Sequence, residues 1–348
     1  MQIRVSPLRL NKRYPLTISR GTSAGSDNLL VEVTHDGITG LGEMAPVNIG
    51  HGEEGAAEMA AALESWGGLL ADVAPWEMQK VEEWLGPVAG FGAARAALDM
   101  ALHDWVGKRT GMPVYAMLGT DPARIVPTSI TVGINAPDVV RERVPELLAR
   151  LKPRYLKVKL GSPQGVEADK GMFEVVRELT PPEVGLRVDA NGGWSVDTAV
   201  TMCQWLFERD VDYVEQPLPV GQEEDLHAVR SGSFIPLFAD ESCRFACDVP
   251  KLSGLVDGVN LKLMKSGGIR EGLRVIHTAR AHGLKVMMGC MSESSLAIAA
   301  SVHLSPLADC LDLDSHLNLL PDPCRGLSWE DGRVLPSDAP GLGVRLTE

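Results

Sequence analysis

Hydrophobic and polar positions follow two different patterns along the chain. In the first 50 residues they alternate in short runs, and "LLVEVTHDGITGLGEMAP" holds two such runs joined by Asp36-Gly37, a dipeptide typical of hairpin turns. From about 55 to 110, Ala-rich segments such as "GAARAALDMALHDWVGKRTG" have helical spacing. Together these patterns predict an α+β unit over residues 1–120.

After about residue 125 strands and helices are expected to alternate. Eight short apolar or β-branched runs follow one another, with helical stretches between most of them: "VPTSITVGI", "YLKVKL", "VGLRVDAN", "DYVEQP", "PLFADE", "GVNLKLM", "KVMMGC" and "CLDLDS". This number of β/α units predicts an α/β fold of the (β/α)8 type, a modified TIM barrel, over residues 121–324. The loop-rich segment 325–348 is expected to pack back on the N-terminal unit.

One of the helical stretches, "SVDTAVTMCQWLFERD", illustrates the pattern. Ser195 is a suitable N-cap for this helix. The apolar stripe is predicted to comprise Val196, Ala199, Val200, Cys203 and Phe207.

Composition narrows the class of protein. The formal net charge of −13 argues against nucleic acid or an anionic membrane surface as the main partner. The start "MQIRVSPLRL" is too polar for a signal peptide, and no apolar run is long enough for a membrane span. The six cysteines form no CxxC pair, so we expect reduced packing residues in a cytoplasmic protein.

Three acidic residues lie near the C-terminal ends of the third, fourth and fifth runs. They are Asp189 in "RVDANGG", Glu215 in "YVEQP" and Asp240 in "FADES", each about one β/α unit after the last. In a barrel they would meet at the rim where active sites are built. Such an all-oxygen set favours a hard divalent cation, with Mg²⁺ the leading candidate. For any one of the three, the alternative is a helix N-cap or a residue of the first helical turn.

Lysines flank these acids in the predicted barrel. Lys157 and Lys159 alternate on the second run and share a face, and Lys262 lies on the sixth run, across the barrel. A neighbouring ammonium and a divalent cation both disfavour a charged lysine, which would lower its pKa toward that of a useful base. The pair could instead mark a solvated face. Two opposed bases and Mg²⁺ suit removal of the proton beside a carboxylate through an enediolate, with return to the other face.

The motifs "GLGEMAP", "KVK", "DAN", "EQP", "DES" and "NLKLMKSGG" resemble those of the enolase superfamily, muconate-lactonizing-enzyme subgroup, over nearly the whole chain. The resemblance implies that residues 1–120 form a capping domain. It implies Mg²⁺ ligands at Asp189, Glu215 and Asp240, an acid/base pair of Lys159 and Lys262, a supporting Lys157 and a structural Lys265. It also suggests a homo-oligomer.

The eighth run discriminates among the reactions of this subgroup. Asp312 and Asp314 in "CLDLDS" share a face, and an acidic pair without a metal role predicts a cationic partner such as a substrate ammonium. Pairing with structural cations is the alternative. The dipeptide epimerases of the subgroup carry such an Asp-x-Asp, which implies Mg-dependent epimerisation of the C-terminal residue of a dipeptide, L,L to L,D, by 1,1-proton transfer.

Other reactions of the subgroup remain alternatives. They are N-acylamino acid racemisation, o-succinylbenzoate synthesis and muconate cycloisomerisation, none of which needs the aspartate pair. A different class of protein, a catalytically silent barrel that binds a metal-chelated carboxylate, is disfavoured because both bases and all three ligands are present.

Further candidates for the substrate-binding site are less specific. Thr131 in "SITVG" matches a substrate-contacting position of the resembled family, although strands commonly carry threonine. Glu293 in "GCMSES" is a candidate pocket residue or a framework acid. Loops at about 18–28 and 46–56 would set side-chain specificity, with Arg20 binding an acidic side chain or Glu53 and Glu54 a cationic one.

Overall fold

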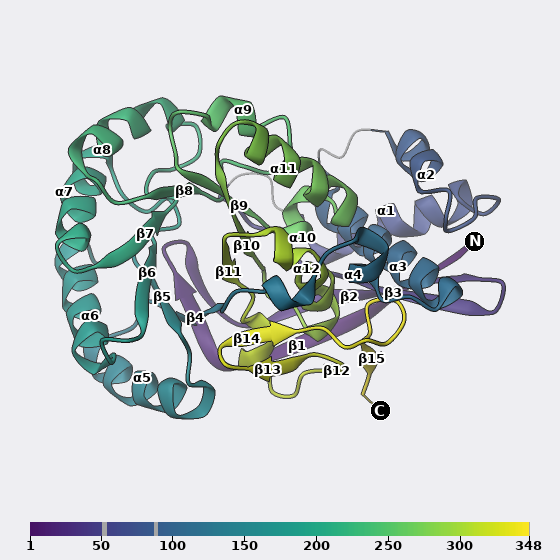
Figure 1. Cartoon of the computed structure of the whole chain (residues 1–348), viewed down its shortest axis with the longest axis horizontal. Coiled ribbons are helices and arrows are strands. Elements are labelled where there is room, and N and C mark those ends of the chain that lie inside the picture. The colour runs from purple at the N-terminus through teal and green to yellow at the C-terminus, as the bar shows by residue number, and fades with distance from the viewer. Residues whose placement is uncertain (51–53, 87–89, 348) are drawn as a thin grey trace.

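A computed structural model describes residues 1–50, 54–86 and 90–347. Strands β1 (Gln2–Ile18), β2 (Gly21–His35) and β3 (Ile38–Met44) form an antiparallel sheet in that order (Figure 1). Asp36 and Gly37 join β2 to β3 with φ of 48° and 73°, as the hairpin prediction requires. The predicted antiparallel start of the chain is confirmed.

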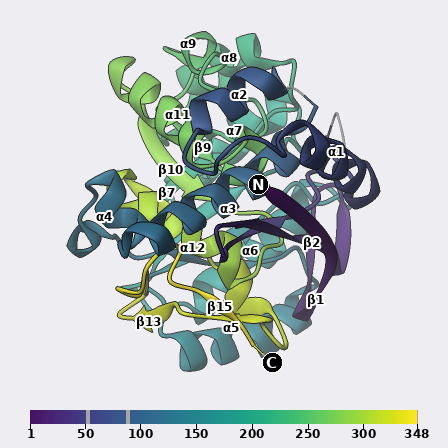
Figure 2. The same cartoon turned by 90° about the vertical axis from the view of Figure 1, so that its right-hand side faces the viewer.

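The helical region that follows divides into separate helices: α1 (Ala56–Leu69), α2 (Met78–Leu85), α3 (Gly92–Thr110) and α4 (Val114–Leu118), then the 3₁₀ turn η1 (Pro122–Arg124). Almost all of α3 is buried, because it packs between the antiparallel sheet and the barrel (Figure 2). A Cβ atom added to Gly42 of β3 would lie 1.9 Å from the Ala97 carbonyl oxygen of α3. Only glycine permits this close approach.

All eight predicted barrel runs are strands, and they form one parallel sheet in chain order (Figure 1). They are β4 (Ser129–Val132), β5 (Tyr155–Lys159), β6 (Gly185–Asp189), β7 (Val211–Glu215), β8 (Leu237–Ala239), β9 (Gly258–Leu261), β10 (Lys285–Gly289) and β11 (Cys310–Asp312). A parallel bridge between Thr128 and Leu311 joins the first strand to the last, so the barrel closes. The predicted fold class is confirmed.

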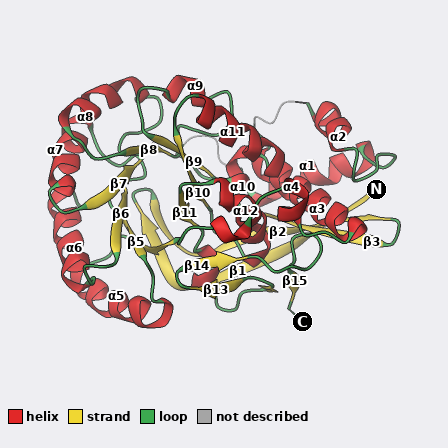
Figure 3. Cartoon of the chain, viewed as in Figure 1, coloured by secondary structure: helices red, strands yellow, loops and turns green. Residues whose placement is uncertain are grey.

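Helices surround these strands (Figure 3). They are α5 (Pro137–Leu151), α6 (Val166–Leu179), α7 (Val196–Phe207), α8 (Leu226–Gly232), α9 (Val249–Leu252), α10 (Leu263–Ser266), α11 (Ile269–Ala281) and α12 (Ser295–Leu304), with 3₁₀ turns η2 (Glu223–Asp225), η3 (Ser305–Leu307) and η4 (Ser315–Asn318). Within the described ranges, none of the helices combines the length and the apolarity needed to cross a membrane.

Helix α7 confirms one sequence prediction and corrects another. The Ser195 side chain accepts a hydrogen bond from the Thr198 amide, as expected of an N-cap. Phe207 is 50% exposed, however, while Met202 and Leu206 are fully buried. The face against the barrel is therefore rotated from the predicted stripe. Phe207, at the end of the helix, lies beside the exposed Phe234, with 6.0 Å between the ring centroids.

The last segment forms β12 (Cys324–Arg325), β13 (Ser328–Glu330), β14 (Arg333–Leu335) and β15 (Arg345–Leu346). The Leu342 amide donates a 2.8 Å hydrogen bond to Asp104 of α3, so the tail reaches the N-terminal unit. Trp329 Nε1 donates to the Leu151 carbonyl oxygen of α5 at 2.9 Å, so the tail also braces the barrel. All six cysteines are free thiols, but Cys247 is exposed and is not the packing residue that we expected.

Candidate active site

The three predicted metal ligands lie together at one rim of the barrel. Asp189 ends β6, Glu215 ends β7 and Asp240 follows β8. One carboxylate oxygen of each lies within 4.8 Å of the others, and all three residues are fully buried. They converge because neighbouring parallel strands end at the same rim and Asp189 pairs directly with Glu215.

Lysines approach this triad from opposite sides. Lys159 ends β5 and places Nζ 2.6 Å from Asp189 Oδ2, whereas Lys262 follows β9 and places Nζ 2.6 Å from Asp240 Oδ2. Strands β5 and β9 are four positions apart in an eight-stranded barrel, so the two ammonium groups face one another across the site. Lys265 also contacts Asp240, at 2.6 Å, but is completely buried.

Lys157 is a buried counter-ion and not part of a solvated face. Its Nζ lies 2.5 Å from Glu215 Oε2, 2.6 Å from Asp312 Oδ2 and 3.3 Å from Asp189 Oδ2. Burial alone would lower the pKa of Lys157, but these three carboxylates outweigh it and raise that pKa well above its ordinary value.

The expected lowering of the lysine pKa by mutual repulsion is not found at Lys157 or Lys262. Burial opposes the charge of Lys262, yet Asp240 and Glu215 raise its pKa. The physical reason is that several buried carboxylates surround each of these lysines and outweigh the repulsion from a neighbouring ammonium. A divalent cation on the same carboxylates would oppose this effect.

The carboxylates fit a hard divalent cation. Burial raises the pKa of Asp189, but Lys159 and Lys157 prevail and bring it to about 2, so Asp189 is ionised. Burial and then the charge of Asp189 raise the pKa of Glu215 to about 8. Glu215 Oε2 accepts no hydrogen bond despite its burial and its contact with Lys157, while Oε1 accepts a 2.8 Å bond from Asn260 Nδ2. An oriented all-oxygen set of this kind suits Mg²⁺.

The aspartate pair lies on the other side of the barrel, on β11 and just after it. One oxygen of Asp312 holds Lys157, and its Oδ1 is buried without a hydrogen-bond partner. Asp314 Oδ2 accepts a 2.6 Å hydrogen bond from the Thr131 amide. Burial and then Asp312 raise the pKa of Asp314 to about 6. Asp312 Oδ1 can therefore accept a further hydrogen bond, and both aspartates line a cavity.

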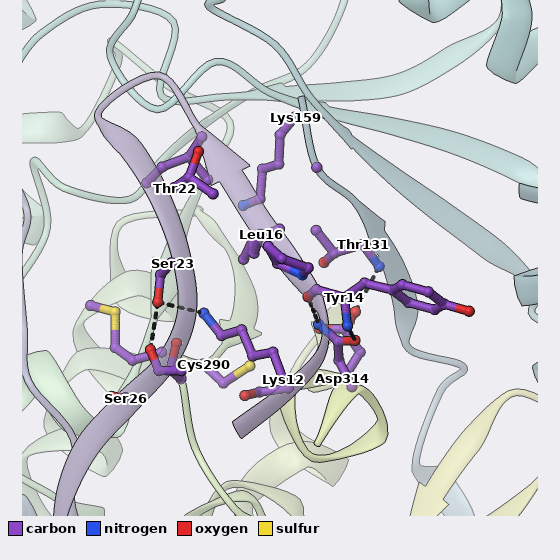
Figure 4. Close-up of a pocket in the computed structure, with 18 of the residues that line it drawn as sticks. Lys12, Tyr14, Leu16, Thr22, Ser23, Ser26, Thr131, Lys159, Cys290 and Asp314 are labelled. Atoms are coloured by element: carbon purple, nitrogen blue, oxygen red, sulfur yellow. Dashed lines mark hydrogen bonds between the residues drawn. The ribbon is translucent and has the colours of Figure 1, made fainter. Parts of the chain in front are cut away.

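A cavity of about 780 Å³ joins these groups (Figure 4). Lys159, Lys262, Asp312, Asp314 and Thr131 line it together with strand β1 of the N-terminal unit. Glu293 does not line it: the side chain is 2% exposed, and its carboxylate accepts a 2.8 Å bond from the Met291 amide behind the wall. Burial raises the pKa of Glu293 to about 8.

In the loops at about 18–28 and 46–56, the charged residues that the structure describes already have partners. Arg20 Nη2 lies 2.7 Å from Glu241 Oε1, and Arg20 Nη1 donates to the Asn191 carbonyl oxygen at 2.8 Å. Glu54 pairs with Arg244 and accepts a 2.7 Å bond from the Ala93 amide. Glu53 lies outside the described residues. Neither Arg20 nor Glu54 therefore presents an unpaired charge to the cavity.

Sequence reasoning missed the contribution of β1 to the cavity wall. Lys12, Tyr14 and Leu16 line the cavity, and Cys290 faces them from the end of β10 (Figure 4). A signal was present, because a lysine shares the strand face of Leu10, Tyr14 and Leu16. Glu241, directly after the predicted metal ligand Asp240, was also missed.

Comparison with known proteins agrees with this geometry. Residues 1–119 match the family model for the mandelate racemase / muconate lactonizing enzyme N-terminal domain, and residues 139–348 match the model for the enolase C-terminal domain-like family. A hydrophobic dipeptide epimerase of Roseobacter litoralis is 51% identical, covering 100% of this chain and 99% of the relative. One of Flavobacteria bacterium is 47% identical, with coverage of 100% and 99%.

Solved structures show the same relationship. The dipeptide epimerase from Enterococcus faecalis V583, complexed with Mg and the dipeptide L-Leu-L-Tyr, superimposes with a TM-score of 0.91 at 34% identity, covering 99% of this chain and 98% of that one. The chain belongs to the mandelate racemase / muconate lactonizing enzyme family of the enolase superfamily.

Proposed function

We propose that this protein is a Mg-dependent dipeptide epimerase, which inverts the C-terminal residue of an L,L-dipeptide. The observation that carries the proposal is the placing of Lys159 and Lys262 on opposite sides of the carboxylate triad, in one cavity with Asp312 and Asp314. The relatives named as hydrophobic dipeptide epimerases support it.

The reaction divides among residues of this chain. Mg²⁺ held by Asp189, Glu215 and Asp240 would bind the substrate carboxylate and, as a Lewis acid, make the adjacent C–H more acidic. Lys159 or Lys262 removes the α-proton, and the opposed lysine delivers one to the other face. Each ammonium lies 2.6 Å from a ligand carboxylate, so both are held beside the reacting carbon.

The amino terminus of the dipeptide would lie at the aspartate pair. Lys157 neutralises one oxygen of Asp312, which leaves Oδ1 and the Asp314 carboxylate for the substrate ammonium. This assignment requires a free amino group. It separates the proposal from an N-acylamino acid racemase, whose substrate would present an amide to two buried acids.

The side chain of the second residue would meet an apolar wall. Leu16, Ile18, Pro46 and Ala56 are among the residues that line the cavity. Arg20 is paired with Glu241 and Glu54 with Arg244, so neither selects a charged side chain. We therefore propose apolar second residues as the preferred substrates.

The test is proton NMR of L,L-dipeptides in D₂O with the protein and Mg²⁺. Loss of the α-proton signal of the C-terminal residue, with appearance of L,D-dipeptide signals, is expected. N-acetylated dipeptides serve as the control and are expected to be unchanged. Exchange in the acetylated compounds alone would favour the racemase, and no exchange in either would favour the silent barrel.

Two further properties belong to the proposal. Six free thiols favour a reducing compartment, so we propose a cytoplasmic enzyme. We also propose a homo-oligomer, for which the exposed Phe207–Phe234 pair is a candidate contact. Light scattering on the purified protein, with Phe234→Ser as the variant, tests the second point.

A further inference from the structure

A lysine of the N-terminal unit reaches into the cavity from strand β1. Lys12 lies on the cavity wall next to β2, and its Nζ donates a 3.2 Å hydrogen bond to Ser23 Oγ (Figure 4). Its backbone forms a bridge with Leu319, which holds this part of β1 beside the segment after β11. The backbone of Lys12 is therefore held by the bridge with Leu319, and its ammonium by the hydrogen bond to Ser23.

Lys12 differs from most of the other cations that line the cavity. Most of these are paired with carboxylates: Arg9 with Asp27, Arg20 with Glu241, Arg150 with Glu146, Lys159 with Asp189 and Lys262 with Asp240. Arg143 donates to Asn135 and lies over the Tyr14 ring. Within the described part of the chain, Lys12 makes no ion pair, and Ser23 is its side-chain hydrogen-bond partner.

The environment of Lys12 favours the arrival of an anion. The residue is half-buried, and burial lowers the pKa of its ammonium because water is partly removed. One hydroxyl does not replace the lost hydration of a charge. A carboxylate that reached Lys12 would form a charge-assisted hydrogen bond in a partly dehydrated site, where such bonds are stronger than at the surface.

Lys12 lies near the end of the cavity that would hold the first residue of a dipeptide. Cys290, beside Lys12 in Figure 4, follows β10, and its thiol donates to the Asp312 carbonyl oxygen at 3.3 Å. Strands β10 and β11 lie across the barrel from β6, β7 and β8, which carry the carboxylate triad. A dipeptide with its carboxylate at the triad and its ammonium at Asp312 and Asp314 thus has its first side chain near Lys12.

We propose that Lys12 binds a carboxylate on the side chain of the first residue, so that the preferred substrates carry Asp or Glu at the amino terminus and an apolar residue after it. This inference deepens the proposed function and rests on it for the direction of the dipeptide. Charge balance permits it, since Lys157 already neutralises Asp312 and the substrate ammonium neutralises Asp314.

The test compares two substrates of equal shape, L-Glu-L-Leu and L-Gln-L-Leu, by calorimetric titration in the presence of Mg²⁺. The unmodified protein is expected to bind L-Glu-L-Leu about tenfold more tightly, as for one charge-assisted hydrogen bond. Lys12→Met should remove this preference and leave the affinity for L-Gln-L-Leu within about twofold. Arg13→Met, at the neighbouring exposed position, is the matched control and should preserve the preference.

The outcomes separate the two proposals. Equal binding of both dipeptides by the unmodified protein overturns the role of Lys12. This comparison does not depend on whether a variant folds. A preference that survives in Lys12→Met overturns it as well. Exchange of the α-proton, measured by NMR on the same samples, reports the proposed function independently: a preference lost in Lys12→Met without any exchange would support the Lys12 site and contradict the epimerase.

Discussion

Arg20 Nη2 lies 2.7 Å from Glu241 Oε1, which fastens the turn between β1 and β2 to the residue that follows Asp240. The arginine side chain is 26% exposed and the glutamate 3%, so the pair is largely shielded from water. In a second ion pair the N-terminal unit supplies the acid. Glu54, in the next loop, pairs with Arg244 of the same barrel segment. Two loops of the N-terminal unit that line the cavity are thus held to the barrel segment that contains Asp240, a proposed metal ligand.

Removing the Arg20–Glu241 ion pair should weaken the binding of every dipeptide substrate. Arg20→Met leaves the buried Glu241 without its cationic partner and with the hydrogen bond from Asn191. We expect KM to rise about 10- to 150-fold, as for a lost hydrogen bond to a charged group. If Arg20 instead selected acidic side chains, the loss would be confined to dipeptides ending in Glu. Steady-state kinetics with L-Ala-L-Leu and L-Ala-L-Glu distinguish the two roles.

A double-mutant cycle tests whether the partner is Glu241. Arg20→Met combined with Glu241→Gln should cost less than the sum of the single changes, because neither charge is then left unpaired. Arg4→Met is the control, since Arg4 forms an exposed 3.7 Å ion pair with Glu32 outside the cavity and should have no effect on KM. If the effects of the two substitutions on KM were strictly additive, Arg20 and Glu241 would not act as a pair.

The two lysines should have separable roles in proton transfer. Lys159→Met and Lys262→Met are each expected to lower epimerisation by about 10²- to 10⁴-fold, the usual contribution of a general base. Each variant should still exchange the α-proton of one epimer with D₂O, and the epimer should differ between them. NMR of the separate L,L- and L,D-dipeptides measures this.

Lys251 is the control for these substitutions, because its side chain is 74% exposed. Lys251→Met should behave as the unmodified protein. Exchange of both epimers by either active-site variant would show that one lysine serves both faces, contrary to their placing across the triad.

Substrate binding should weaken in acid through Asp314. Burial and the charge of Asp312 raise the pKa of Asp314 to about 6, so the carboxylate that pairs with the substrate ammonium is present above pH 6 and lost below it. We expect kcat/KM to fall up to tenfold per pH unit below about 6. In Asp314→Asn, kcat/KM should be about 10- to 100-fold lower at pH 8, and this acid limb should be missing. Asp27→Asn, an exposed cavity position, should retain it.

Mg²⁺ should stabilise the fold through the triad. At a Mg²⁺ concentration of 100 times Kd, binding to the folded state adds about 2.7 kcal/mol to the free energy of unfolding. Urea unfolding with Mg²⁺ and with a chelator measures this increment. Glu215→Gln should abolish most of it, whereas Glu174→Gln, at a half-exposed position on the outer surface, should leave it intact. An equal increment in Glu215→Gln would place the cation elsewhere.

Local pattern was sufficient to predict the fold and the meeting of three acidic residues at one rim of the barrel. Eight strand-like runs spaced by helices lead to one parallel barrel, because a crossover helix returns the chain to the same end of the sheet each time. That regularity places Asp189, Glu215 and Asp240 at one rim without any knowledge of side-chain contacts. The alternation of Asp312 and Asp314 predicted their shared face in the same way.

Charge partners were decided only by the tertiary structure. Lys157 contacts Asp312, which lies 155 residues away in the sequence. Arg20 pairs with Glu241, which lies 221 residues away. The local sequence pattern does not predict such contacts, and they overturn two expectations. The pKa of Lys157 is raised and not lowered, and Arg20 is paired with Glu241 and is not free to bind an acidic side chain. The sequence by itself therefore determined where the strands place their ends. Three-dimensional packing determined which charges remain free, because electrostatic pairing depends on distance and burial and not on position in the chain.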